Sequence, residues 1–183
     1  PVVVVGAAGV GVGLVRRLLA AHPDVAAMRA RAPIHRIADQ LPRYAAQPWP
    51  DCVDHLPRAG GAHIGARWQC DLEENARGAQ VVLDASPTDI AHLGLVALLA
   101  PGARVIVVQR NPLDAALSAF RRLLRGEQGA RSRTLEDVSE ATAQDAELMQ
   151  HWERTLPLAF HTIDYDSLVQ QPGKTLSQLW DFL

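Results

Sequence analysis

Short runs of apolar, mostly β-branched residues recur along the chain, and segments with helical periodicity separate them. The runs are Val2–Val5, Val81–Asp84, Val105–Val108 and Ala159–Ile163. Unbroken apolar runs of this length are typical of parallel strands that are buried on both faces. Strands that alternate with helices indicate a parallel sheet covered by helices. The pattern therefore predicts an α/β domain of three layers.

The segments between these runs carry helix-start signals. Asn111 precedes Pro112 with Asp114 two residues further on, an arrangement that favours a helix N-terminus. Thr134-x-x-Asp137 resembles a capping box for a long helix. We expect helices over residues 14–21, 89–100, 112–124 and 134–152, and a last one from residue 168 onward that is interrupted near residue 172.

Residues 25–72 form a variable region. Prolines at positions 33, 42, 48, 50 and 57 are expected to interrupt any long element there. A substrate-facing insertion and a surface excursion with short helices both fit this composition.

Length and charge narrow the classes of function. A chain of 183 residues fits a single domain with a real core, and its net charge of −2 gives no bulk attraction to nucleic acid or anionic membrane. No apolar run approaches the roughly 20 residues of a membrane span.

Cys52 and Cys70 make neither a disulfide framework nor a metal set, so a reduced, cytoplasmic setting is expected. The chain starts without Met at a strand, and we expect it to be an excerpt of a longer protein.

A glycine-rich loop, GAAGVGVG, follows the first run. Backbone N–H groups at a helix N-terminus bind anions, and glycine lets the chain approach a phosphate closely. A nucleotide-hydrolysing P-loop would continue with Lys and Ser or Thr, where this chain has Val12 and Gly13, so hydrolysis of ATP or GTP is not expected. The loop residues assigned to ligand binding are Gly6, Gly9, Val10, Gly11, Val12 and Gly13.

Two alternatives for this loop stay open. VVVVGAAG before a helix also looks like the start of a nicotinamide-dinucleotide fold, but neither Tyr44 nor Tyr165 is followed four residues later by the lysine of a short-chain dehydrogenase. A glycine turn that packs a helix on a strand and binds nothing is the other alternative.

The segment VIVVQRNPLDAALSAF, residues 105–120, suggests a second phosphate contact. Arg110 leaves the end of a buried strand, and Ser118 lies two turns inside the next helix. A guanidinium donates forked, charge-assisted hydrogen bonds to phosphate oxygens, and a hydroxyl adds another donor. The pair is predicted to clamp a phosphate.

In order along the chain, four segments resemble the sulfotransferases that use 3′-phosphoadenosine-5′-phosphosulfate (PAPS), notably a bacterial branch joined to tetratricopeptide repeats. They are PVVVVG with LVRRLLAAHPDV, then HLGLVALLAPGARVIVVQRNP, the helix start at residues 113–120, and HWERTLP with IDYDSLVQQPGKTLSQLWDFL. The resemblance covers well over half of the chain. It implies a P-loop-like α/β domain.

The resemblance also implies ligands. Arg110 and Ser118 stand where the family binds the 3′-phosphate of PAPS or of adenosine 3′,5′-bisphosphate, without a metal. The expected acceptor is a hydroxyl of a small molecule, a glycan or a peptide, and tetratricopeptide repeats are expected elsewhere in the full-length chain. Nucleic acid is not expected as a partner.

This sequence departs from the family pattern at several positions. The family carries a basic residue at Gly9 and hydroxyls at Val10, Val12 and Gly13, and a Lys or His where Ala85 stands. The Gly-Glu that supplies a base has no counterpart at residues 26–28. Substitute catalytic candidates are Asp84, Ser86 and His35. Sulfuryl transfer from PAPS, full or impaired, is thus expected beside the alternative of a catalytically silent relative that binds a nucleotide weakly or serves as an interaction domain.

Overall fold

A single parallel sheet organises the computed structural model, which describes residues 1–28, 33–55, 58–76, 78–85, 87–121 and 131–183. Five strands pair in the order β2-β3-β1-β4-β5. They are β1 (Val2–Val5), β2 (Val25–Ala27), β3 (Val81–Ala85), β4 (Arg104–Gln109) and β5 (Ala159–Asp164). Every pairing is parallel, so all the strands end at the same edge of the sheet.

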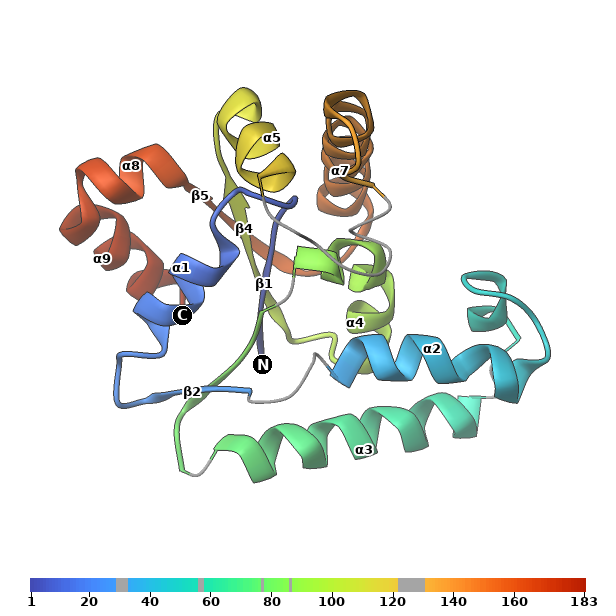
Figure 1. The fold of residues 1–183 in the computed structure, drawn as a ribbon. Helices are drawn as coiled ribbons and strands as arrows, with labels where there is room; N and C mark the ends of the chain where they lie inside the picture. Colours follow the sequence, from blue (N-terminus) through green and yellow to red (C-terminus); the bar gives the residue numbers. More distant parts are fainter. Residues whose placement is uncertain (29–32, 56–57, 77, 86, 122–130) are drawn as a thin grey trace.

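Helices cover both faces of this sheet (Figure 1). The core on one face joins Val3 and Val5 to residues of α2, α3, α4 and α7, whereas the core on the other joins Val2 and Val4 to residues of α1, α8 and α9. The alternation follows from the pleat, which points successive side chains to opposite faces. The helices are α1 (Val12–Leu19), α2 (Pro33–Ala45), α3 (Arg58–Ala76), α4 (Leu93–Leu99), α7 (Leu135–Thr155), α8 (Tyr165–Gln170) and α9 (Pro172–Phe182). The predicted three-layer α/β architecture is confirmed.

Side-chain caps start the helices that follow β4 and precede β5. In α5 (Pro112–Phe120), Asn111 Oδ1 accepts a hydrogen bond from the backbone N–H of Leu113 at 3.0 Å. At the start of α7, Thr134 and Asp137 accept from each other's backbone N–H groups, each at 3.0 Å. Both caps were predicted from the sequence, and α5 and α7 lie side by side at the carboxyl edge of the sheet (Figure 1).

The variable region differs from the prediction. It contains β2, two long helices and the short 3₁₀ helix η1 (Asp51–Val53), and α2 continues through Pro42. The expectation that prolines interrupt any long element was therefore wrong. A proline inside a helix removes one hydrogen bond, but burial of Ile34, Ala38 and Leu41 of α2 in the core offsets that loss. Trp68 of α3, whose sequence neighbours are polar, is fully buried.

Trp152 ties α7 to the segment after β3. That segment is the 3₁₀ helix η2 (Pro87–His92), which leads into α4. The indole Nε1 of Trp152 donates to the carbonyl oxygen of Ile90 at 2.8 Å, and the ring packs against the sheet-facing core. This contact links α7 to the segment that joins β3 to α4.

No helix in the described part of the chain combines the length and the apolar character that crossing a membrane requires.

We predict that Trp152→Phe lowers the free energy of unfolding by about 1–3 kcal/mol, because the Ile90 carbonyl loses its donor while the aromatic packing is largely kept. Chemical denaturation measures the change. Trp180→Phe is the matched control, since Trp180 loses a similar ring volume and keeps its contact with the His22 ring. Equal losses in the two variants would show that the hydrogen bond contributes nothing.

Candidate functional site

The carboxyl edge of the sheet brings together three segments that are far apart in sequence. The glycine-rich loop follows β1, Arg110 follows β4, and Tyr165 follows β5. β4 pairs with β5 so that Gln109 lies opposite Asp164. The next residue on each strand is therefore Arg110 on one side and Tyr165 on the other. In open parallel sheets, ligands bind at this edge.

Arg110 lies between Tyr165 and the loop. Its guanidinium carbon is 4.4 Å from the centre of the Tyr165 ring, which is cation–π distance. One terminal nitrogen, Nη1, donates to the carbonyl oxygen of Gly9 at 3.3 Å. Its Nε is buried and has no hydrogen-bond partner among the described residues. A half-buried guanidinium with a donor to spare is suited to bind an anion.

Left-handed backbone at two glycines shapes the loop. Gly9 has φ 91° and Gly11, which caps α1, has φ 107°. A β-carbon at Gly9 would lie 2.2 Å from the carbonyl oxygen of Ala115 in α5, and one at Gly11 would lie 2.5 Å from the Tyr165 ring. Glycine is therefore required at both positions, because the loop packs directly against α5 and Tyr165.

Valine side chains line the interior of the loop. Val10 and Val12 are buried, and both lie in the core on the α1 face of the sheet. A β-carbon at Gly6 would lie 2.6 Å from a methyl group of Val10. This part of the loop offers apolar surface where a phosphate-binding loop offers hydroxyls.

A cavity of about 280 Å³ opens between the loop, the end of β4 and α7. One wall comes from Gly6, Ala7 and Val10 of the loop together with Gln109 and Arg110. The facing wall comes from α7, with Thr142, Asp145, Ala146, Met149, Gln150 and Glu153. Ile90, Val107, Val108, Pro112 and Ala115 complete the lining. The cavity thus has a guanidinium on one side and carboxylates on the other.

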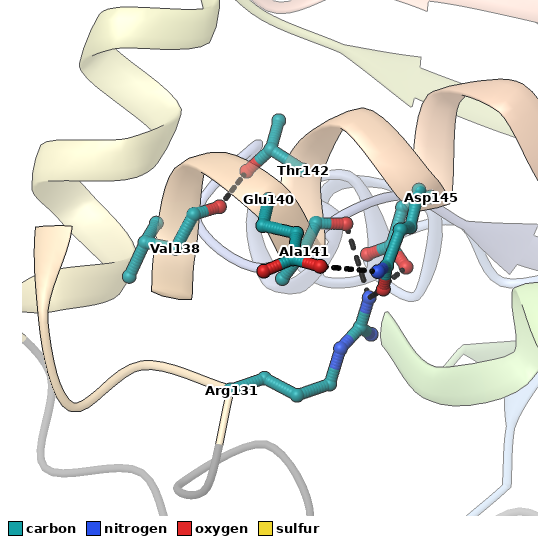
Figure 2. Close-up of polar contacts among 7 residues, drawn as sticks. Arg131, Val138, Glu140, Ala141, Thr142 and Asp145 are labelled. Atoms are coloured by element: carbon teal, nitrogen blue, oxygen red, sulfur yellow. Dashed lines mark hydrogen bonds and ion pairs between the residues drawn. The ribbon is translucent and has the colours of Figure 1, made fainter. Parts of the chain in front are cut away.

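Arg131 holds Asp145 in place on the α7 wall (Figure 2). Arg131 Nη2 donates to Asp145 Oδ1 at 2.9 Å and to the carbonyl oxygen of Ala141 at 3.0 Å. Burial raises the pKa of the Asp145 carboxyl, and the Arg131 guanidinium partly opposes that rise. A second, smaller cavity is lined by Ala8 of the loop together with Arg131, Thr142 and Asp145, among others. Asp145 therefore lies beside the glycine-rich loop.

The structure brings some of the predicted site residues together and separates others. Gly6, Val10 and Arg110 line the larger cavity. Gly9, Gly11, Val12 and Gly13 belong to the same loop but are not among the lining residues. Ser118 is half-buried in α5 and is also not part of the lining.

The predicted catalytic candidates lie elsewhere. Asp84 is buried at the end of β3, opposite Val3 of β1. His35 of α2 packs edge-on against the His92 ring at 4.5 Å. Neither is among the described residues that line the cavity, and Ser86 lies outside the described residues.

Among the residues that the structure describes, no group of three or more His, Cys, Asp or Glu side chains is placed to hold a metal ion.

Two features of the site were missed by sequence reasoning. Tyr165 was considered only as a dehydrogenase tyrosine, although IDYDS places it directly after a strand end. The α7 wall carries no motif, but its lining residues follow the i, i+3, i+4, i+7 spacing of one helix face: Thr142, Asp145, Ala146, Met149, Gln150 and Glu153. Strand-end position and helical periodicity were the signals that could have found them.

Comparison with known proteins gives the family. A sequence model described as "Sulfotransferase family" matches residues 1–183. A protein of Aquifex aeolicus (strain VF5) is 23% identical over 194 residues, an alignment that covers 100% of this chain and 25% of that protein. The chain therefore spans about a quarter of the length of that relative.

Solved structures show the same fold. A sulfotransferase from Alicyclobacillus acidocaldarius superposes with a TM-score of 0.66 at 16% identity, covering 99% of this chain and 79% of that one. The sulfotransferase domain of the Synechococcus PCC 7002 olefin synthase gives 0.60 at 19% identity, covering 99% and 71%. A deoxyadenosine kinase from M. mycoides gives 0.52 at 10% identity, covering 98% of each chain, which indicates a P-loop-like fold. With the family match over its whole length, the chain belongs to the sulfotransferase family.

Proposed function

We propose that the domain binds PAPS at the carboxyl edge of the sheet and transfers its sulfuryl group to an acceptor hydroxyl of a small molecule, a glycan or a peptide. The observation that carries the proposal is Arg110, whose buried Nε lacks a partner among the described residues and whose guanidinium lines the cavity. A donor of this kind costs free energy unless a ligand satisfies it.

In this proposal Arg110 binds the 3′-phosphate of the nucleotide. The Tyr165 ring orients the plane of the guanidinium, and the Gly9 carbonyl accepts a hydrogen bond from Arg110 Nη1. The other guanidinium N–H groups are then available to phosphate oxygens. Ser118, eight residues further on in α5, is the proposed second donor.

The glycine-rich loop is proposed to hold the 5′ end through its backbone. Gly13, in the first turn of α1, has no atom within 4 Å of the position that a β-carbon would take, so the helix N-terminus is open to a ligand there. Backbone N–H groups and the helix dipole both favour negative charge at such an end. When bound, PAPS supplies the activated sulfuryl group, and this chain positions it.

One observation favours a second candidate function, a catalytically silent relative that binds the nucleotide without turning it over. Val10 and Val12 bury apolar side chains where the family pattern has hydroxyls. Each charged hydrogen bond that a loop lacks costs about 1.5–3 kcal/mol of ligand or transition-state stabilisation. Two such losses would slow turnover by about 10²- to 10⁴-fold while Arg110 still binds the 3′ end.

We predict that adenosine 3′,5′-bisphosphate raises the melting temperature of the protein, whereas NAD, ATP and GTP do not. A ligand that binds the folded protein but not the unfolded chain stabilises the folded state. The stabilisation grows with the logarithm of the ligand concentration divided by Kd. Differential scanning fluorimetry measures the shift. A shift with NAD instead would favour the dinucleotide-binding alternative.

Arg110→Ala is expected to raise the Kd for adenosine 3′,5′-bisphosphate by about 10- to 150-fold, the equivalent of a lost charged hydrogen bond. Arg110→Lys should recover part of the affinity, because lysine keeps the positive charge but cannot donate the paired hydrogen bonds of a guanidinium. Isothermal titration calorimetry measures Kd. Arg67→Ala is the matched control, since Arg67 is an exposed arginine of α3 that pairs with Asp71 at 3.6 Å, away from the cavity. An unchanged Kd in Arg110→Ala would contradict the clamp.

Tyr165→Leu is expected to raise the Kd for adenosine 3′,5′-bisphosphate by about 2- to 30-fold, because the guanidinium of Arg110 loses the ring that orients it. Tyr165→Phe keeps the ring and should bind like the parent protein. The same calorimetric titration compares the two. If Phe were as damaging as Leu, the phenol hydroxyl would be the important group and the stacking argument would be wrong.

Turnover separates the two candidate functions. Incubation with PAPS and a panel of phenol, sugar and peptide acceptors should release adenosine 3′,5′-bisphosphate, detected by ion-pair chromatography. If the bisphosphate binds but PAPS is never consumed, the silent-relative function is correct.

A further inference from the structure

We propose that Asp145 of α7 is the general base of this domain and accepts the proton of the acceptor hydroxyl, with Arg131 as its positioning residue. The inference rests on the proposed sulfuryl transfer and assigns a residue to a step for which the chain lacks the family's expected groups.

The cavity offers few proton acceptors. Among the described residues that line it, the carboxylates are Asp145 and Glu153, and the charged group on the facing wall is Arg110. Asp145 also lines the smaller cavity beside Ala8, so it lies next to the loop that would hold the sulfuryl end of PAPS. Glu153 lies two helical turns further along α7 and is exposed. Position therefore favours Asp145.

Asp145 is also held in a fixed orientation. Arg131 binds its Oδ1 at 2.9 Å and is itself anchored on the Ala141 carbonyl, as Figure 2 shows. The contact uses one carboxylate oxygen and leaves Oδ2 for another donor. The Asp145 side chain is 17% exposed, so the carboxylate is shielded from bulk water without being sealed off. A base oriented by a third group is a recurring arrangement in nucleophile activation.

Burial and the neighbouring charge of Arg131 act in opposite directions on the pKa of Asp145, and burial has the larger effect. Arg131 comes from the segment before α7, Arg110 from the junction of β4 and α5, and Glu153 from α7 itself, while η2 contributes the uncharged Ile90 to this cavity. Burial raises the pKa of Asp145 despite Arg131. A base with a pKa nearer the working pH is a better catalyst than an ordinary aspartate.

The step conserves atoms and charge. The acceptor oxygen forms a bond to sulfur while the bond from sulfur to the 5′-phosphate oxygen breaks, and adenosine 3′,5′-bisphosphate leaves with that electron pair. The acceptor proton passes to Oδ2 of Asp145, which later releases it to water. Alcohol hydroxyls are weak acids, so they need this base more than acidic phenols do.

Asp145→Asn keeps the size of the side chain and removes its basicity. We expect kcat/KM for an alcohol acceptor to fall by about 10²- to 10⁴-fold, the usual contribution of a general base, with a smaller fall for an acidic phenol. The Kd of adenosine 3′,5′-bisphosphate should not rise. Glu147→Gln, an exposed carboxylate of the same helix outside the cavity, is the matched control and should behave like the parent protein.

The pH profile tests the role of Arg131. A base works only when deprotonated, so kcat/KM should fall as the pH drops through the pKa of Asp145, and this acid limb should vanish in Asp145→Asn. Arg131→Gln removes the charge that lowers the Asp145 pKa, so the limb should move to higher pH. A purely structural role for Arg131 would lower activity without moving the limb.

A titration of the Asp145 carboxyl by ¹³C NMR gives a readout that needs no turnover. Its midpoint should lie above that of an ordinary aspartate and should rise further when the anionic bisphosphate binds in the same cavity.

Four results would overturn the inference. Two concern Asp145 itself: a carboxyl titration with the midpoint of an ordinary aspartate that the bisphosphate leaves unchanged, or full activity in Asp145→Asn. The other two are loss of activity in Glu153→Gln instead, and no turnover with any acceptor. If the bisphosphate still binds in an Arg110-dependent way, each of these results leaves the proposed nucleotide site intact. Loss of that binding would instead remove the proposed function itself.

Discussion

The pairing of β4 with β5 is the contact on which the site depends. These strands run side by side from Arg104 opposite Ala159 to Gln109 opposite Asp164. A shift of one residue in that register would turn the buried strand residues to the wrong faces, so the two cores hold the alignment in place. The same alignment sets Arg110 beside Tyr165, although the two residues are far apart in sequence. The orientation of the guanidinium is thus a product of core packing.

The two ends of the proposed nucleotide site are built differently. At the Arg110 end, an aromatic ring and a backbone carbonyl contact the guanidinium that we propose as the anion contact, and its Nε has no partner among the described residues. At the loop end, Val10 and Val12 contribute to the core, and only the backbone remains polar. The carboxylate wall of α7 adds a third, acidic component, which sits opposite the guanidinium.

Much of the fold could be predicted because its signals are local. The strand runs, the Asn111 cap and the Thr134–Asp137 capping box each depend on neighbouring residues, and all are present. The region of residues 25–72 could not be predicted from local signals. Pro42 disfavours a helix by propensity, and α2 forms there because burial of its apolar side chains stabilises it.

The site was predictable to a smaller extent. Arg110 lies in the cavity as a strand-end arginine, which a local pattern can indicate. Tyr165 and Asp145 reach the site through long-range contacts, and the acidic face of α7 has the composition of an ordinary solvated helix. The roles of Ser118 and of the loop glycines remain predictions.

The close approach of Gly9 to α5 limits whether the loop can carry a cationic side chain at this position. The space that such a side chain needs is taken by the Ala115 carbonyl, and the backbone at Gly9 has a left-handed conformation. A lysine introduced there would displace the helix, and with it the Asn111 cap and the arginine that precedes it. Loop and helix are therefore mutually dependent, and a single substitution cannot place a charged side chain at Gly9 without moving α5.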